Sequence, residues 1–362
     1  MFLSQSLPEV FLIFSMYVVY LAMGHTLQCK TIKSGTISLY VRRAADRVME
    51  RRQRYALSHP TLNMVWFHPT LPHGSTVMAP KILSCIGEVK RWETMKDRRE
   101  PLTTDMIYYQ KLQCSSSTPH SVDQVLFDWL VTGIYAGFRL AEWAQDDNVR
   151  TREQVKPTID GEPTAFIIGD LEFFGENRRR MSRSDCLARP YLVQQVDVRW
   201  RYQKNGKRNE KKTFVRISHG SEAVLCSVSA WVRIVQRWSV LGLDDKHPLA
   251  VFTTSGLSTG PIEFIRPSHI NAALRSAASA VYNVTDPKEL AKFSSHSIRV
   301  GACVALHAAG VSKLNITFAL RWKSDSFYTY LRNLPCQAAQ TAAAVLNFSP
   351  NRFTLIPTDR VA

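Results

Sequence analysis

The sequence is poor in cysteine and contains no cysteine pair of metal-binding spacing. Its 362 residues hold seven cysteines, which are scattered along the chain and nowhere form a C-x-x-C pair. This pattern excludes a disulfide-stapled mini-protein and predicts a reducing compartment. His59, His68 and His73 lie close together, but no cysteine stands at a zinc-finger distance from them, so we expect no metal site.

The chain also has little uninterrupted apolar sequence. The run from Val10 to Met23 has fourteen residues, fewer than the roughly 20 needed to cross a bilayer. No Lys or Arg precedes this run, Glu9 sits at its edge, and no small-residue cleavage site follows it. These features favour a buried helix over a signal peptide or a membrane span.

Acidic residues are outnumbered, with 30 Asp and Glu against 46 Lys and Arg, which gives a formal charge of +16. The excess predicts a polyanionic partner, with nucleic acid first and an anionic membrane surface second; a basic protein with no such partner is the alternative. One local feature supports nucleic acid as the partner. Residues 34–54 have the spacing of an amphipathic helix, and its polar face carries Arg42, Arg43, Arg47 and Arg51. We expect this face to contact DNA phosphates, although such faces are often only solvated.

The pattern along the chain predicts a helical part followed by a mixed part. Helical spacing covers residues 10–23, 34–54 and 80–92, and a loop rich in Pro, His and Gly occupies residues 58–75. The polar stretch from Asp97 to Pro101 marks a boundary. We therefore predict an all-helical domain at residues 1–98, a second domain at residues 99–349 and a tail at residues 350–362.

The second domain is expected to combine helices with a small sheet. A helix is predicted from Thr103 towards Leu112 and another over residues 121–138. Residues 164–174, 193–202 and 213–217 are predicted strands, the last two joined around the turn Asn205-Gly206. Helices dominate from residue 222 onward. The predicted fold class is α+β, mostly helical, with a small antiparallel sheet.

Three segments of the second domain carry Arg, His, Trp and Tyr side chains in a fixed order. The segment TGIYAGFRLAEW contains Arg139 and Glu142, and the segment HSIRV contains His296 and Arg299. The segment RWKSDSFYTYLR then contains Trp322, Tyr328 and Tyr330. Taken singly these motifs are weak. Their order resembles the tyrosine recombinase (phage integrase) family, and the RWKSDSFYTYLR phrase resembles its eukaryotic mobile-element branch, the Crypton and DIRS-like recombinases.

The resemblance covers residues 99–333 and, more loosely, the helical first part, which matches the position of the family's core-binding domain. It implies an enzyme whose tyrosine attacks a DNA phosphodiester to form a 3′-phosphotyrosyl link and a free 5′-hydroxyl. It also implies integration or excision of a mobile element, without metal or cofactor. The implied partners are double-stranded DNA and a homotetramer on DNA that is monomeric in solution. Neither a membrane nor a small-molecule substrate is expected, and the implied location is the nucleus.

Four residues match the family's phosphate-binding positions. Arg139 and Arg299 match its two arginines, whose planar forks stay charged and suit the non-bridging oxygens. His296 lies three residues before Arg299, on the same helix face, and is expected to bind the phosphate or to assist proton transfer. Trp322 stands where many relatives have a second histidine. Its indole N–H can donate a hydrogen bond but cannot act as an acid or base.

The predicted nucleophile is Tyr330, eight residues after Trp322. The commoner family spacing is nine, a position that Leu331 holds in this chain. The shorter spacing fits the mobile-element branch, and Tyr328 remains the alternative. An unperturbed tyrosine has a pKa of about 10, so nearby positive charge must help it to lose its proton.

Lys204 is the predicted proton donor for the leaving 5′-oxygen, because it stands beside the Asn205-Gly206 turn and matches the family's hairpin lysine. Lys207, Lys211 and Lys212 compete for this role. Glu142, three residues after Arg139, is expected to orient a neighbouring basic residue or to form a plain helix salt bridge.

Two other functions are compatible with these residues. A type IB topoisomerase-like enzyme would use the same chemistry without exchanging strands between two DNAs. The RWKSDSFYTYLR segment resembles recombinases instead and makes this alternative less favoured. A non-catalytic DNA-binding descendant would retain the fold alone. The complete set of motif residues argues against it, because a mere binder would lose little by changing any one of them.

Overall fold

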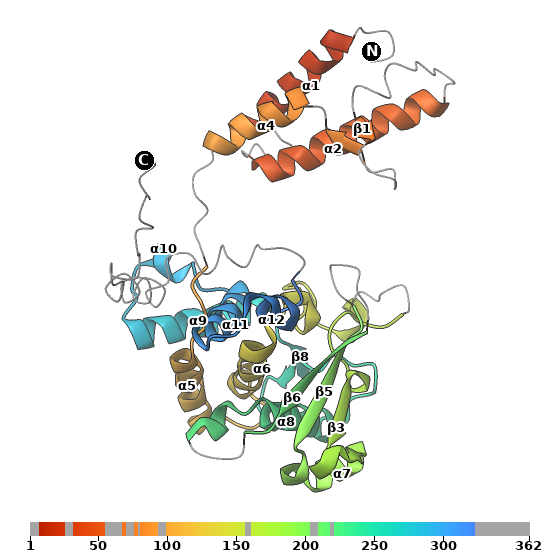
Figure 1. Cartoon of the computed structure of the whole chain (residues 1–362). Helices are drawn as coiled ribbons and strands as arrows, with labels where there is room; N and C mark the ends of the chain where they lie inside the picture. Colours follow the sequence, from red (N-terminus) through yellow and green to blue (C-terminus); the bar gives the residue numbers. More distant parts are fainter. Residues whose placement is uncertain are drawn as a thin grey trace, which may run out of the picture. The chain divides into compact units, whose positions relative to one another are not determined.

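The structure is a computed structural model of the chain, and it describes residues 7–25, 32–54, 67–69, 76–78, 80–92, 99–155, 161–202, 209–217 and 221–322. The chain forms two compact units, Met1–Lys96 and Asp97–Ala362 (Figure 1). The sequence predicted a domain boundary between residues 98 and 99. No helix within the described ranges is both long enough and apolar enough to cross a membrane.

The described residues of the first unit include the helices α1 (Leu7–Ala22), α2 (Ser34–Arg54) and α4 (Pro80–Trp92). These confirm the predicted helices. Their buried side chains form one small core, which consists of Phe14, Val18, Leu21, Ile37, Val41 and Ile86. Helix α1 contributes Phe14, Val18 and Leu21 to this core, whereas its Met16, Val19 and Tyr20 are exposed. The expectation of a buried helix is therefore confirmed for only some of its described side chains.

The first unit also contains a short hairpin, which corrects the all-helical prediction for residues 1–98. Strand β1 (Phe67–Pro69) pairs antiparallel with β2 (Thr76–Met78). Three-residue strands are too short for an alternating pattern to stand out, and the Pro-rich sequence between residues 58 and 75 favoured a loop.

The second unit begins with two helices that have side-chain N-caps. Helix α5 (Thr104–Gln113) follows Thr103, whose hydroxyl accepts a hydrogen bond from the backbone N–H of Met106 at 3.4 Å. Helix α6 (Val122–Ala136) follows Ser121 and ends at Gly137, which has a left-handed φ of 58°. Both helices confirm the sequence prediction to within a few residues.

The described part of the second unit continues with the helices α7 (Arg183–Ala188), α8 (Ser227–Val240), α9 (Pro267–Tyr282), α10 (Pro287–Leu290), α11 (His296–Ala308) and α12 (Lys313–Ala319). Helices α8, α9, α11 and α12 confirm the helical character predicted from residue 222 onward. In Figure 1 the helices α5 and α9 lie on the side of this unit opposite the sheet.

The main sheet has four antiparallel strands in the order β4-β3-β5-β6: β3 (Leu171–Phe174), β4 (Arg180–Met181), β5 (Gln195–Trp200) and β6 (Glu210–Val215). Strands β7 (Val251–Thr253) and β8 (Ile262–Phe264) form a separate pair. The fold class, mostly helical with a small antiparallel sheet, is confirmed. The predicted strand over residues 164–174 is shorter, because Asp170 accepts the N–H of Ile167 and closes a turn before β3.

Alternation along the hairpin strands decides which side chains face the helices. Val196, Val198 and Trp200 of β5 are buried. The register pairs Val198 with Lys212 of β6, so Lys212 lies on the core side of the sheet. The adjoining core is an aromatic cluster that includes Trp129, Phe138, Trp143, Phe166 and Trp231.

Candidate active site

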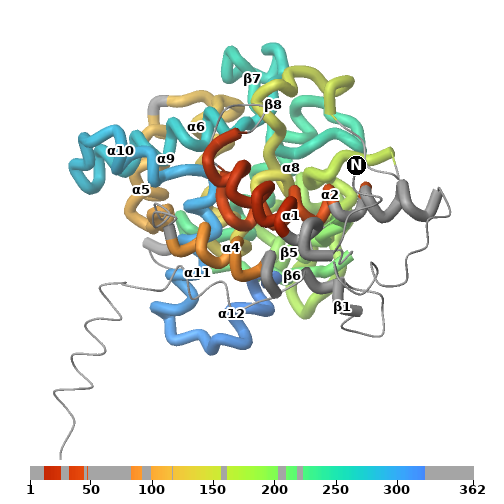
Figure 2. Tube along the Cα trace, turned by 90° about the horizontal axis from the view of Figure 1, so that it is seen from above, coloured from red at the N-terminus to blue at the C-terminus, as the bar shows by residue number. Residues whose placement is uncertain are grey.

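The C-terminal ends of α6 and α12 meet in the second unit and are capped by cationic side chains. The last carbonyls of a helix have no partner within the helix, and they carry its partial negative charge. Lys212 Nζ donates to the carbonyl oxygens of Tyr135, at the end of α6, and Ala319, at the end of α12, at 2.6 and 3.3 Å. Figure 2 shows α11 and α12, in blue, near strands β5 and β6.

Arg299, on α11, joins the same two helix ends. Its Nη1 donates to the Gly137 carbonyl at 2.6 Å and its Nη2 to the Leu320 carbonyl at 2.8 Å. The Arg299 side chain is buried, and its guanidinium carbon lies 5.0 Å from the centre of the Trp322 ring. The planar fork of an arginine suits this bridging position, and the tryptophan face adds a cation–π contact.

The backbone of Gly137 allows this approach. Its φ is 58°, and a Cβ built there would lie 2.7 Å from Leu320 Cδ2 and 3.4 Å from Ala302 Cβ. Only glycine combines the left-handed conformation with this short distance. Gly137 thus lets the end of α6 pack directly against the residues that follow α12.

Arg139 follows Gly137 by two residues and is the most accessible arginine of the group, with a quarter of its side chain exposed. Its Nη1 donates to Glu142 Oε1 at 3.0 Å, and its Nη2 donates to the Arg321 carbonyl at 3.3 Å. The backbone N–H of Arg139 also donates to Glu142 Oε2 at 3.0 Å. Glu142 therefore contacts both the backbone and the guanidinium of Arg139, a basic neighbour of the kind that it was predicted to orient or to pair with.

Glu142 is buried and receives two more donors. Trp200 Nε1 donates to Glu142 Oε2 at 3.1 Å, and Arg321 Nη2 donates to the same oxygen at 3.0 Å. Arg321 stacks over the Trp200 ring, with its guanidinium carbon 4.1 Å from the ring centre. Burial lowers the pKa of Arg321, while the nearby carboxylate of Glu142 opposes this effect.

Lys212 and His296 also have lowered pKa values. Burial, followed by the positive charge of Arg321, lowers the pKa of Lys212 to about 8. His296 lies at the start of α11, where burial lowers the pKa of its imidazole. The positive charges of Arg299 and Arg99 lower this pKa further. Both shifts favour the neutral form, and the shift brings the pKa of Lys212 closer to neutral pH than that of an ordinary lysine.

A cleft of about 680 Å³ opens beside this group, between β6 and α12. Lys212, Arg321 and Trp322 line it, together with the exposed side chains of Leu314 and Phe318. Lys212 and Arg321 therefore border a concave surface, whereas Arg139 and Arg299 do not line it.

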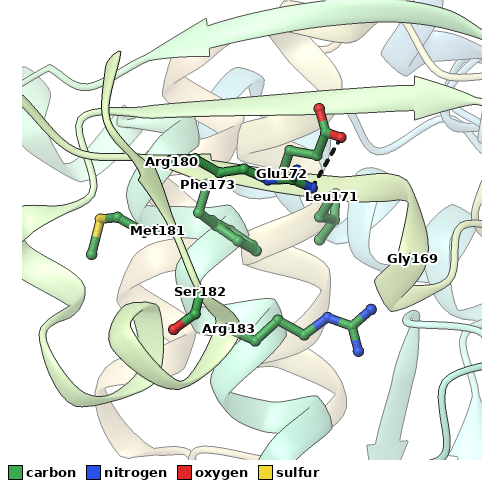
Figure 3. A pocket seen from close by; sticks show the side chains of 8 residues that line it. All are labelled: Gly169, Leu171, Glu172, Phe173, Arg180, Met181, Ser182 and Arg183. Atoms are coloured by element: carbon green, nitrogen blue, oxygen red, sulfur yellow. Dashed lines mark hydrogen bonds and ion pairs between the residues drawn. The ribbon is translucent and has the colours of Figure 1, made fainter. Parts of the chain in front are cut away.

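A second cleft, of about 470 Å³, lies at the β3–β4 edge of the sheet (Figure 3). Its charges are already paired within the fold. Arg180 lies 3.4 Å from Glu172, a contact drawn as a dashed line, and Arg183 lies 2.9 Å from Asp245. None of the predicted site residues lines this cleft. The β6–α12 cleft is therefore the better candidate for a functional site.

The structure brings four predicted residues together: Arg139 and Glu142 through direct contacts, and Arg299 and Trp322 through their ring contact. His296 lies one helical turn from Arg299. Lys204, Tyr328, Tyr330 and the side chain of Arg51 lie outside the described residues. Arg42, Arg43 and Arg47 are exposed on α2, in the first unit.

Sequence reasoning missed Arg321 and Trp200, and it treated Lys212 only as a competitor of Lys204. Strand alternation was the available signal for Lys212, because Lys212 and Phe214 share one face if the strand begins at Glu210. The predicted strand began at residue 213. No local signal connects Arg321 or Trp200 to Glu142.

No model of a known protein family matches the chain, and no curated protein matches it in sequence. Among solved structures, the chain is similar to the Tn1549 transposon integrase (residues 82–397), whose structure was determined in complex with circular intermediate DNA. The two are 13% identical, and the alignment covers 94% of this chain and 85% of that chain with a TM-score of 0.44.

Proposed function

We propose that this chain breaks and rejoins double-stranded DNA as a tyrosine recombinase, through a 3′-phosphotyrosyl intermediate. One observation carries the proposal. Arg139, Lys212 and Arg299, from three separate segments, converge on the adjoining ends of α6 and α12. The chain then passes through Trp322 directly into the segment that contains Tyr330.

The charge of this group suits a phosphodiester. The scissile phosphate carries one negative charge and gains more in its five-coordinate transition state, so fixed donors should supply most of the catalysis. Arg139 is partly exposed and held by Glu142, and it is the arginine best placed to reach an incoming phosphate. Arg299 lies deeper, and we assign it to a second non-bridging oxygen once its carbonyl contacts exchange for the phosphate.

The proposed step is a transesterification in which the number of ester bonds is unchanged. The Tyr330 oxygen forms a bond to phosphorus, and the bond from phosphorus to the 5′-oxygen breaks. The tyrosine proton passes to a neutral base, for which His296 is the candidate. The leaving 5′-oxygen takes a proton from a lysine. Attack of a 5′-hydroxyl on the phosphotyrosyl bond reverses the reaction.

Two lysines are candidates for the proton donor. Lys204 is assigned by the family resemblance. Lys212 is supported by its buried position and by a pKa of about 8, which matches a group that gives up its proton near neutral pH. Separate Lys204→Met and Lys212→Met variants would decide between them. A substrate with a 5′-phosphorothiolate leaving group needs no proton and should restore cleavage to whichever variant lacks the donor.

The wider role is part of the same proposal. A mobile-element recombinase that assembles as a tetramer on DNA and resides in the nucleus follows from the resemblance of the RWKSDSFYTYLR segment. Chromatography with and without a recognised DNA site would show whether assembly requires DNA.

The central test is a covalent trapping experiment. A pool of duplexes of random sequence is labelled at the 5′ end of one strand and nicked at a fixed position. The short fragment released by cleavage diffuses away. The protein therefore stays attached, through the 3′-phosphate, to the strand that carries the label at its 5′ end. We expect an adduct that withstands SDS from the wild-type chain and from Tyr328→Phe, and no adduct from Tyr330→Phe.

Three outcomes contradict parts of this proposal. An absent wild-type adduct rejects the enzyme and favours a non-catalytic binder. An adduct that survives in Tyr330→Phe but disappears in Tyr328→Phe would identify Tyr328 as the nucleophile. Relaxation of supercoiled DNA without exchange between two labelled duplexes favours the topoisomerase-like alternative.

A further inference from the structure

Arg321 is a buried arginine in an unusual backbone conformation. It follows α12 directly, and its φ of 56° lies in the left-handed region, which a residue with a side chain seldom adopts. Its side chain is 5% exposed. A long charged side chain in this position costs both desolvation and backbone strain, so its contacts should account for its presence.

The contacts of Arg321 connect it to the residues that hold Arg139. Its Nη1 donates to the Ala136 carbonyl at 3.2 Å, and its Nη2 donates to Glu142 Oε2 at 3.0 Å. The same oxygen accepts Trp200 Nε1, and the Trp200 ring lies under the guanidinium. Glu142 is therefore fixed from two sides, by Arg139 and by Arg321.

The charges of these three side chains do not cancel. Glu142 contributes one negative charge, and Arg139 and Arg321 contribute one positive charge each. If Glu142 had only Arg139 as its partner, the pair would be neutral and would attract a phosphate weakly. With Arg321 sharing the carboxylate, the three side chains retain one positive charge.

We propose that Arg321 is a positioning residue that holds Glu142 and thereby leaves Arg139 both oriented and electrostatically free to bind the scissile phosphate. This inference rests on the proposed function for its catalytic consequence, but the contact between Arg321 and its neighbours does not depend on that function.

A purely structural role for Arg321, as a cap on α6, would make a different prediction for Lys212. Arg321 is the charged group that acts on the Lys212 ammonium, and both side chains reach the end of α6. Glu210, two residues before Lys212 on the same face of β6, raises the pKa of Arg321 through its negative charge. Burial is the larger cause of the lowered Lys212 pKa, so a neutral loss of packing in this network would raise it somewhat, and removing the Arg321 charge should raise it further.

The experiment compares Arg321→Gly, Arg321→Lys and the control Trp200→Phe in the full chain. Glycine suits the left-handed backbone, so Arg321→Gly removes the guanidinium without backbone strain. Trp200→Phe removes one donor to Glu142 and leaves every charge in place. The Lys212 pKa is followed by NMR of ¹³C-labelled lysine, and the rate of adduct formation is measured on the nicked duplex pool under single-turnover conditions.

We expect Arg321→Gly to raise the Lys212 pKa and to slow adduct formation by at least about tenfold, less than the roughly 10²–10³ for losing a direct donor to the transition state, because Arg321 acts through Glu142 and Arg139. DNA affinity should change little. Arg321→Lys should keep the Lys212 pKa near its wild-type value and recover part of the rate, and millimolar guanidinium should partly rescue Arg321→Gly. Trp200→Phe should raise the pKa less than Arg321→Gly does, because it leaves every charge in place.

Two results overturn the inference: an unchanged Lys212 pKa in Arg321→Gly, or adduct formation at the wild-type rate in that variant. If the wild-type chain forms no adduct at all, the proposed function fails. The titration of Lys212 still decides whether Arg321 acts on this group, so the two failures are distinguishable.

Discussion

Lys212 and Arg299 cap neighbouring carbonyls at the end of α12, with Lys212 Nζ 3.3 Å from the Ala319 oxygen and Arg299 Nη2 2.8 Å from the Leu320 oxygen. Each side chain also donates to a carbonyl at the end of α6, at 2.6 Å in both cases. Two negative helix ends therefore stabilise two cations that arrive from a strand and from a third helix. A shift of either helix end would displace both cations together.

Replacing Lys212 by Met should remove a pH-dependent component of stability. The folded pKa of about 8 lies below the ordinary value of 10.5. Between these two values the unfolded chain holds the proton and the folded chain does not, so this residue makes stability rise with pH across that window. Below it, the folded state bears the cost of a buried ammonium, about 3 kcal/mol when the shift is converted to free energy.

The measurement is urea unfolding of the wild-type chain and Lys212→Met over this pH range. The difference between their unfolding free energies should change by up to about 3 kcal/mol in favour of the wild type as pH rises. Lys211→Met is the matched control, because Lys211 is half exposed and paired with Glu172 at 2.7 Å. Parallel pH curves for the wild type and Lys212→Met would contradict the prediction.

Gly137→Ala should be more costly than Gly161→Ala. Gly137 and Gly161 have φ values of 58° and 73°, so both substitutions bear the strain of about 1–2 kcal/mol for this conformation. Only at Gly137 does the new Cβ meet another side chain, at 2.7 Å from Leu320, which is fully buried. We expect an additional loss of about 1–3 kcal/mol by chemical denaturation. Equal losses for the two variants would show that Leu320 moves aside freely.

Much of this arrangement follows from local sequence. The apolar spacing predicted α2, and the hydroxyls of Thr103 and Ser121 marked the starts of α5 and α6. The pairing of Arg139 with Glu142 also follows from a three-residue separation. In each case the residues that support the prediction lie within one or two helical turns of each other along the chain.

The remaining contacts of the site depend on distant packing. Arg321 reaches Glu142 across 179 positions, and it does so from a left-handed backbone that no arginine prefers. The sequence Glu210-Lys211-Lys212 carries only charged residues, so it resembled a solvated turn until its pairing with β5 fixed which side chains turn inward. Propensity and periodicity carry no information on either relationship.

Asp128→Asn should destabilise the second unit strongly and independently of the site. Asp128 is fully buried on α6, and it accepts Arg233 Nε at 2.6 Å and Arg237 Nη2 at 2.7 Å. The amide keeps the shape of the side chain but leaves the buried Arg237 without its counter-charge, which should cost about 3–5 kcal/mol. Asp245→Asn, which breaks the exposed pair with Arg183, should cost under about 1 kcal/mol. Thermal or urea unfolding of the two variants makes the comparison, and similar losses would refute it.

Neutralising the basic face of α2 should weaken DNA binding in a salt-dependent way. Arg42, Arg43 and Arg47 are exposed on this helix. If each neutralises one phosphate, the triple change to Gln should reduce the slope of log affinity against log salt by up to about 2.7, since each phosphate contact contributes about 0.9. Fluorescence anisotropy with a mixed-sequence duplex at several salt concentrations measures this slope.

The charge-matched control removes three cations that are already paired in the second unit, Arg183 with Asp245, Arg189 with Asp185 and Lys292 with Glu289. Both triple variants lower the net charge of the chain by three, so a general electrostatic attraction would weaken both alike. Direct phosphate contacts by α2 would change the slope only in the first. Equal slopes for the two variants would mean that the arginine face is solvated, and the positive charge used for DNA would then have to lie elsewhere in the chain.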